Sequence, residues 1–142
     1  MSTLSLENAN LIIESALRRS VEAGHAAMAV VVLDDAGNVK AVQRQDGASM
    51  FRVDVALGKA WGAVAFGVSS RSLAERAETN PNFFLTLSAT ARGRLLPQPG
   101  AVLIRDGKGG QILGAAGASG GNGDEDEEIC AHGVSEAGFS VD

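Results

Sequence analysis

The feature that constrains the fold most is a glycine-rich segment followed directly by a run of acids. Five glycines lie within residues 114–123, after a short apolar run that begins at Ile112, and five consecutive acids occupy 124–128. Glycine permits tight turns and close backbone approach. Acidic side chains in the first turn of a helix complement the positive end of its dipole. The pattern therefore predicts a strand, a tight glycine loop and the N-terminus of a helix.

The same loop has a second interpretation, because unpaired N–H groups at a helix N-terminus can bind an anion. The usual phosphate signatures are absent, since no Gly-Lys-Ser/Thr ending and no Gly-x-Gly-x-x-Gly after the first strand is present. Five neighbouring carboxylates would also repel a polyphosphate. We therefore favour a structural turn that leads into a capped helix over a phosphate cradle.

The chain length fits one domain over residues 1–142, and the composition excludes several classes of partner. A net charge of −5 disfavours binding to nucleic acid or to an anionic membrane, since both depend on clustered Lys and Arg. The chain has one Trp and no Tyr, so it offers no platform on which bases could stack. We expect neither a nucleic-acid nor a membrane partner.

The single cysteine, Cys130, excludes an intrachain disulfide and a Cys-rich zinc site. It is expected to act as a buried small hydrophobe rather than as a nucleophile. No segment reaches the ~18 apolar residues of a membrane helix, and no secretory pattern opens the chain. These observations predict a cytoplasmic protein.

Hydrophobic periodicity predicts helices that alternate with two β-hairpins. The first expected helix starts at Leu6 and is stopped by Gly24, and four more span 49–66, 69–78, 82–90 and 124–137. The expected hairpins span 27–44 and 101–116, and a further short strand is expected at 94–96. Hairpins imply antiparallel pairing, and the helices must cover the sheet to bury their apolar stripes. The prediction is an α+β domain with about five antiparallel strands.

Several of these segments together resemble the GlcG/HbpS-like family, also called the haem-degrading or DUF336 family. The resemblance is carried by LSLENA (4–9), VVVLDDAGN (30–38), RQDGA (44–48), GKAWGAVAFG (58–67) and LGAAGASGG (113–121). It covers nearly the whole chain in the expected order. The family implies a profilin-like α+β fold with a five-stranded antiparallel sheet, and homo-oligomers that are often octamers.

Three functions follow from the resemblance and the residues. The first is a small-molecule-binding protein, with haem or a related tetrapyrrole as the leading ligand, because some members of the family bind haem. The second is an enzyme that acts on a small carboxylated metabolite. The third is a structural or assembly protein, in which Met50, Phe51, Phe83 and Phe84 contact other subunits; for these side chains we favour core packing.

Lys59 is the candidate catalytic residue, and it matches the family's Lys-Ala pair. It lies between small residues on the predicted second helix. A partly enclosed lysine can act as an acid/base group or bind a ligand carboxylate. The alternative is a structural salt bridge, for example to an acid of the last helix, or a surface lysine.

Two loops complete the candidate ligand site. Arg44, Asp46 and Gly47 lie between a strand end and a helix start, where Arg44 would hold a carboxylate. An Arg44–Asp46 pair within the loop is the alternative. Ser119, Gly120 and Gly121 would wall the pocket.

The two imidazoles, His25 and His132, are the candidates for a metal or a haem iron, although turn or helix-surface positions are the simpler interpretation. His25 is expected to be exposed. Met28 and Met50 are alternative soft ligands, with core packing preferred. Asp124, Glu127 and Glu128 share a helical face and would hold a hard cation, but we favour a solvated acidic run.

Overall fold

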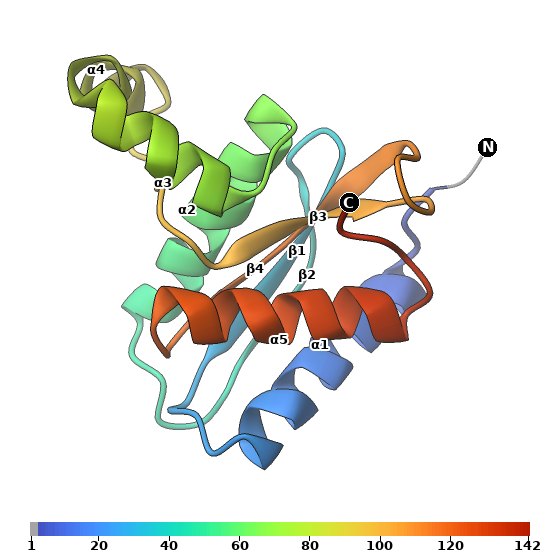
Figure 1. The fold of residues 1–142 in the computed structure, drawn as a ribbon. Coiled ribbons are helices and arrows are strands. Elements are labelled where there is room, and N and C mark those ends of the chain that lie inside the picture. Colours follow the sequence, from blue (N-terminus) through green and yellow to red (C-terminus); the bar gives the residue numbers. More distant parts are fainter. Residues whose placement is uncertain (1–2) are drawn as a thin grey trace.

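The computed structural model describes residues 3–142, which form five helices and four strands (Figure 1). In chain order these are α1 (Leu6–Glu22), β1 (Ala29–Asp34), β2 (Val39–Arg44), α2 (Phe51–Phe66), α3 (Ser70–Thr79), α4 (Pro81–Thr90), β3 (Ala101–Arg105), β4 (Ile112–Ser119) and α5 (Gly123–Glu136). Local signals explain several ends. Ser5 caps α1 by accepting the Asn8 N–H at 3.0 Å, and Gly67 ends α2 with φ 69°.

The strands form one sheet in the order β2-β1-β4-β3, and every pairing is antiparallel. Val31 of β1 lies opposite Val42 of β2 and Gly117 of β4, which in turn lies opposite Ala101 of β3. The predicted α+β class and the antiparallel pairing are confirmed. The expectation of about five strands is wrong for residues 3–142, where the sheet has four.

The missing strand is the segment 94–96, which is irregular. Leu95 is buried in a small apolar cluster with Leu73 of α3 and Phe84 of α4. The Leu96 N–H donates to the carbonyl oxygen of Gly58 in α2 at 3.3 Å. The segment therefore packs against helices rather than along a sheet edge, although its sequence is apolar enough for a strand.

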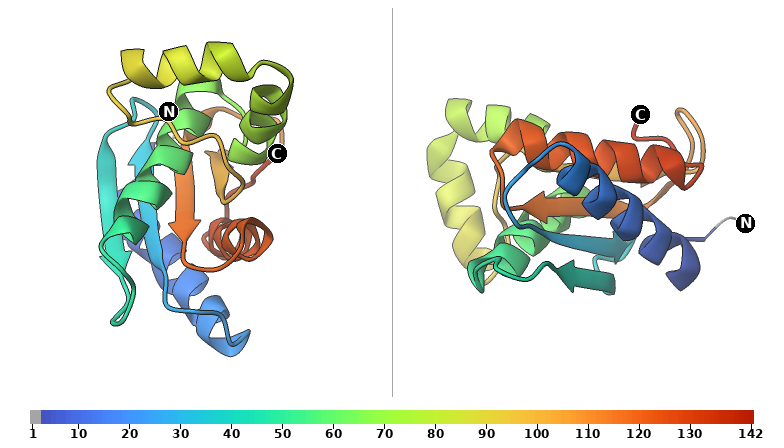
Figure 2. Two further views of the ribbon diagram at one scale, coloured as in Figure 1. Left: turned by 90° about the vertical axis from the view of Figure 1, so that its left-hand side faces the viewer. Right: turned by 90° about the horizontal axis from the view of Figure 1, so that it is seen from below.

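Helices cover both faces of the sheet, as Figure 2 shows. α1 and α5 pack together on the face that carries Val30 and Val32. α2 packs on the opposite face, which carries Val31 and Leu33. Successive side chains of β1 point to opposite faces of the sheet, and helices bury both faces. This explains why the sequence of β1 is apolar almost throughout.

The α3 and α4 helices form a lobe at one side of the sheet, at the upper left of Figure 1. Phe84 is 7% exposed and stacks on Phe66, in line with core packing. Core packing is wrong for Met50, Phe51 and Phe83, which are 78%, 64% and 49% exposed. Homo-oligomer formation stays a prediction. Over residues 3–142, no helix combines the length and the apolar character needed to cross a membrane.

Candidate ligand-binding cavity beside Lys59

A cavity of about 520 Å³ lies between α2, the loop before β3 and the glycine loop that joins β4 to α5. Its lining residues come from these segments, the end of β4 and the first turn of α5: Arg52, Val55, Lys59, Leu96, Gln98, Pro99, Ser119, Gly121, Asn122, Gly123, Asp124 and Asp126. Chain segments far apart in the sequence therefore meet at one place. The expected strand, glycine loop and helix at 112–137 are present, and the loop forms one wall.

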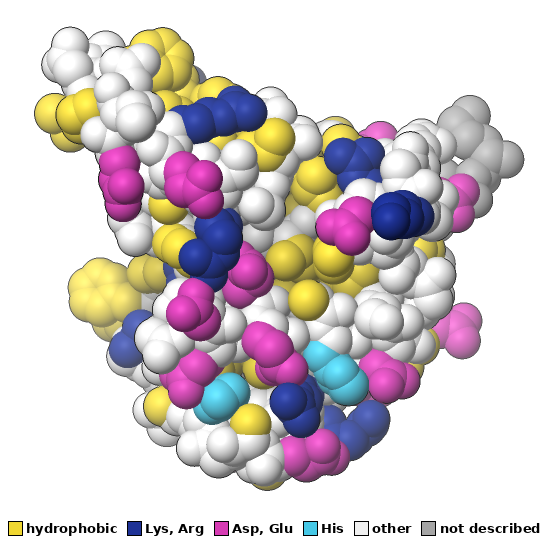
Figure 3. Space-filling model, viewed as in Figure 1, with side chains coloured by type: hydrophobic (Ala, Val, Ile, Leu, Met, Phe, Trp, Pro, Cys, Tyr) yellow, Lys and Arg dark blue, Asp and Glu magenta, His cyan; other side chains and the backbone are white. Residues whose placement is uncertain are grey.

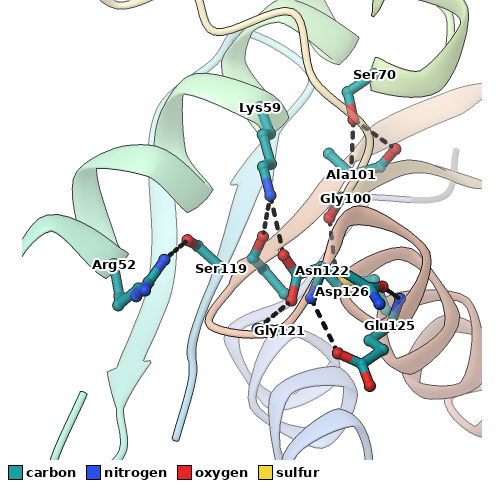
Figure 4. A network of polar contacts seen from close by, with 12 residues as sticks. Arg52, Lys59, Ser70, Gly100, Ala101, Ser119, Gly121, Asn122, Glu125 and Asp126 are labelled. Atoms are coloured by element: carbon teal, nitrogen blue, oxygen red, sulfur yellow. Dashed lines mark hydrogen bonds and ion pairs between the residues drawn. The ribbon is translucent and has the colours of Figure 1, made fainter. Parts of the chain in front are cut away.

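Lys59 lies at the inner side of this cavity and is almost fully buried, with 5% of its surface exposed. Its Nζ atom donates to Asp126 Oδ2 at 3.0 Å and to the Ala118 carbonyl oxygen at 3.1 Å (Figure 4). Asp126 Oδ1 accepts the Gly121 N–H at 2.9 Å. The ion pair thus joins α2, the end of β4, the glycine loop and α5. A salt bridge from Lys59 to an acid of the last helix was one of the two sequence-based interpretations.

The chain passes closely over this ion pair at Gly100, just before β3. The φ angle of Gly100 is 137°, and a Cβ atom there would lie 2.6 Å from Lys59 Nζ. Only glycine fits this backbone and this space. Cys130 is fully buried, and its Sγ atom lies 3.8 Å from the Gly100 carbonyl oxygen. Burial raises the pKa of the Cys130 thiol above its usual range and disfavours the thiolate, in line with the expected role as a buried small hydrophobe.

Arg52 is the cationic residue of the cavity that sequence reasoning missed. It lies two turns before Lys59 on α2, and its Nη1 atom donates to Ser119 Oγ at 3.3 Å (Figure 4). No acidic side chain within residues 3–142 forms an ion pair with it. The spacing of Arg52, Val55 and Lys59 along a helix places all three on one face, and this was the signal that could have identified it.

The other sequence-predicted site residues divide into two groups. Ser119 and Gly121 line the cavity together with Lys59. Gly120, between them, does not line it, and a Cβ atom there would lie 2.5 Å from the Ala27 carbonyl oxygen. Arg44, Asp46 and Gly47 do not line it. The Arg44 Nη1 atom instead donates to the Ala48 carbonyl oxygen at 2.6 Å. Their role in ligand binding stays a prediction.

The acids that begin α5 have individual partners. Arg71 of α3 contacts Asp124 and lies 3.0 Å from Glu127, and these two hydrogen-bonded carboxylates raise the pKa of Arg71 above its usual value. Glu128 pairs with Arg19 at 2.9 Å. A fully solvated acidic run is therefore wrong for Asp126, which is 1% exposed.

Glu125 takes part in the cap of α5. Its Oε1 atom accepts the Asn122 N–H at 2.9 Å, while the Asn122 side chain accepts the Glu125 N–H at 2.8 Å. This reciprocal pair is a capping box, which satisfies two unpaired donors at the helix start. The predicted capped helix after the glycine loop is confirmed.

Both histidine side chains are visible among acidic and basic side chains on the side of the molecule that Figure 3 shows. His25 Nδ1 is 3.1 Å from Glu125 Oε2, and its side chain is only 16% exposed, so the expected exposure is wrong. His132 lies 3.8 Å from Glu136, one turn further along α5. Across residues 3–142, no three His, Cys, Asp or Glu side chains group as a metal site would require.

The four-stranded antiparallel sheet and its five helices define an α+β protein, in which the cavity lies beside the Lys59–Asp126 ion pair. Residues 4–135 match the sequence model of the family described as Haem degrading protein HbpS-like, and the chain belongs to this family. No curated protein sequence matches the chain.

Solved structures with the same fold include proteins of this family. The chain is similar to the structure described as a PduOC–haem complex, with 22% identity, 99% coverage of both chains and a TM-score of 0.86. It is also similar to a double mutant of Streptomyces reticuli HbpS, with 27% identity, coverage of 97% and 89%, and a TM-score of 0.82. A third is the Klebsiella pneumoniae protein ORFY, with 23% identity, coverage of 96% and 92%, and a TM-score of 0.85.

Proposed function

We propose that this protein binds haem or a related tetrapyrrole in the cavity beside Lys59. Family membership and the haem complex of a protein with the same fold support the choice of ligand. The choice of this cavity as the binding site rests on one observation: the Arg52 guanidinium lines the cavity and has no acidic partner among the described residues. A cavity of about 520 Å³ also lies within the usual range for small-molecule sites.

The residues of the cavity fit one part of a haem and not the other. The guanidinium of Arg52 suits a carboxylate, which it can bind through two parallel hydrogen bonds. Val55, Leu96 and Pro99 offer apolar surface to a ring. However, no lining residue is a His, Met, Cys or Tyr, the side chains that usually ligate haem iron. The cavity therefore fits the carboxylates of a tetrapyrrole and offers no ligand to its metal.

In this proposal Lys59 positions the site rather than performing acid/base chemistry. Its ammonium group already donates to two buried acceptors, Asp126 and the Ala118 carbonyl. Asp126 holds the Gly121 N–H on its other oxygen, so the pair fixes the glycine wall against α2. An enzyme acting on a carboxylated metabolite would use the same Arg52, but no contact of Lys59 favours a catalytic role.

Titration with haem tests the proposal directly. We expect a saturable change in the Soret band at one haem per chain, because the proposal places one ring in the cavity of each chain. His25→Ala and His132→Ala should bind haem like the unmodified protein, since neither histidine lines the cavity. Absence of any spectral change at stoichiometric haem would end the proposal, and loss of binding in either histidine variant would move the site out of the cavity.

A further inference from the structure

We infer that this site recognises the carboxylates of its ligand and not a metal, so that metal-free dicarboxylate porphyrins bind as well as haem. The inference rests on the proposed function and specifies its ligand class, a planar organic anion. In this inference, Arg52 makes ligands with free carboxylates bind more tightly than ligands whose carboxylates are blocked as esters. Three observations carry it: the charge balance of the cavity, the setting of Arg52, and the positions of the metal-binding side chains.

The charged groups that line the cavity differ in whether a group of opposite charge pairs with them. Lys59 and Asp126 neutralise each other at 3.0 Å, both almost fully buried. Asp124, at the rim, shares the Arg71 guanidinium of α3 with Glu127. Arg52 has no such partner within the described chain. An anionic group that enters the cavity therefore meets a cation whose charge no protein carboxylate already satisfies.

The guanidinium of Arg52 is oriented by one contact and keeps its other donors. Ser119 is 1% exposed, and its Oγ atom accepts from Arg52 Nη1 at 3.3 Å. A guanidinium has five N–H donors in a fixed fork, so four stay available after this bond. The Ser119 hydroxyl accepts from Arg52 and can donate its own proton to a ligand oxygen. Together the two side chains form a receptor for a carboxylate.

The side chains that bind iron lie elsewhere. Met28 and Cys130 are fully buried in the core on the α1 and α5 face of the sheet. His25 is held by Glu125, and His132 lies beside Glu136. None of these four lines the cavity. A metal at the centre of a bound ring would thus receive no ligand from the cavity wall, and it should contribute little to affinity.

The test compares haem, metal-free protoporphyrin IX and the dimethyl ester of protoporphyrin IX by absorbance and fluorescence titration. For the unmodified protein we expect the first two to bind with equal affinity within about threefold, and the ester at least about tenfold more weakly. Arg52→Met should weaken both acids at least about tenfold and leave the ester unchanged. Arg52→Lys should recover only part of the affinity, because a lysine lacks the fork. Arg18→Met, at an exposed arginine of α1, is the matched control and should have no effect.

The outcomes separate this inference from the proposed function. If haem binds and metal-free protoporphyrin IX binds more than tenfold more weakly, the metal is recognised; the inference is overturned while the proposed function stands. If neither ligand binds, the proposed function fails as well. If Arg52→Met folds with an unchanged melting temperature and still binds both acids like the unmodified protein, the assignment of Arg52 is overturned.

Discussion

Lys59→Ala is expected to lower the free energy of unfolding by about 3–5 kcal/mol, because Asp126 would stay buried without its cation. Asp126 is 1% exposed, and without Lys59 its carboxylate would keep the Gly121 N–H as its hydrogen-bond donor but would lose its cation. For a chain of this length the loss corresponds to a decrease in melting temperature of roughly 10–17 °C. Thermal and denaturant unfolding, followed by circular dichroism, measure the effect.

Two control variants show whether the ion pair is the cause. Lys108→Ala removes an exposed lysine in the β3–β4 loop and should leave the melting temperature unchanged. The double variant Lys59→Met, Asp126→Leu removes both charges and should recover much of the lost stability, as replaced buried ion pairs often do. If Lys59→Ala instead melts like the unmodified protein and abolishes ligand binding or turnover, Lys59 acts on the ligand and its structural role is wrong.

Gly117→Val is expected to cost about 3 kcal/mol of stability, because α2 lies directly on the β4 backbone at this residue. A Cβ atom at Gly117 would lie 2.5 Å from the Ala56 carbonyl oxygen and 3.0 Å from the Ala60 Cβ atom. The first of these is backbone, which cannot rotate away. The whole helix must shift, and Arg52 and Lys59 are on that helix, so ligand affinity should fall as well.

Urea unfolding and the haem titration measure the two effects of Gly117→Val together. Gly107→Asn serves as the control, because Gly107 has open space around its Cα atom and asparagine tolerates its φ of 81°. It should unfold and bind like the unmodified protein. Normal stability of Gly117→Val would show that α2 does not depend on this close approach.

The sequence was sufficient to predict most helices and strands of the fold and the antiparallel direction of the strand pairing. The helical stripe from Leu6 and the alternation after Asn38 have strong periodicities, and the turn at Asp34 is set by local hydrogen bonds to Ala36 and Asn38. The strand expected at 94–96 failed because its apolar residues fit equally well between helices, and local pattern cannot separate these two environments. The profilin-like classification stays a prediction.

The candidate site was predictable in part. Lys59 and the glycine wall were identified because their residue types and their order match the family. Which of five consecutive acids would meet Lys59 depends on how α5 crosses the sheet, and periodicity alone does not give this. Arg44 was assigned the carboxylate because it ends a strand, but its side chain bonds the Ala48 carbonyl, and Arg52 occupies the cavity.

The most direct test of the central claim is a crystal structure of the protein with protoporphyrin IX bound. We expect the ring in the cavity between α2 and the glycine loop, with a carboxylate within hydrogen-bond distance of the Arg52 guanidinium and Ser119 Oγ. The Lys59–Asp126 pair should be intact beneath it. A ring held at His25 or His132, with Arg52 facing solvent, would contradict the claim.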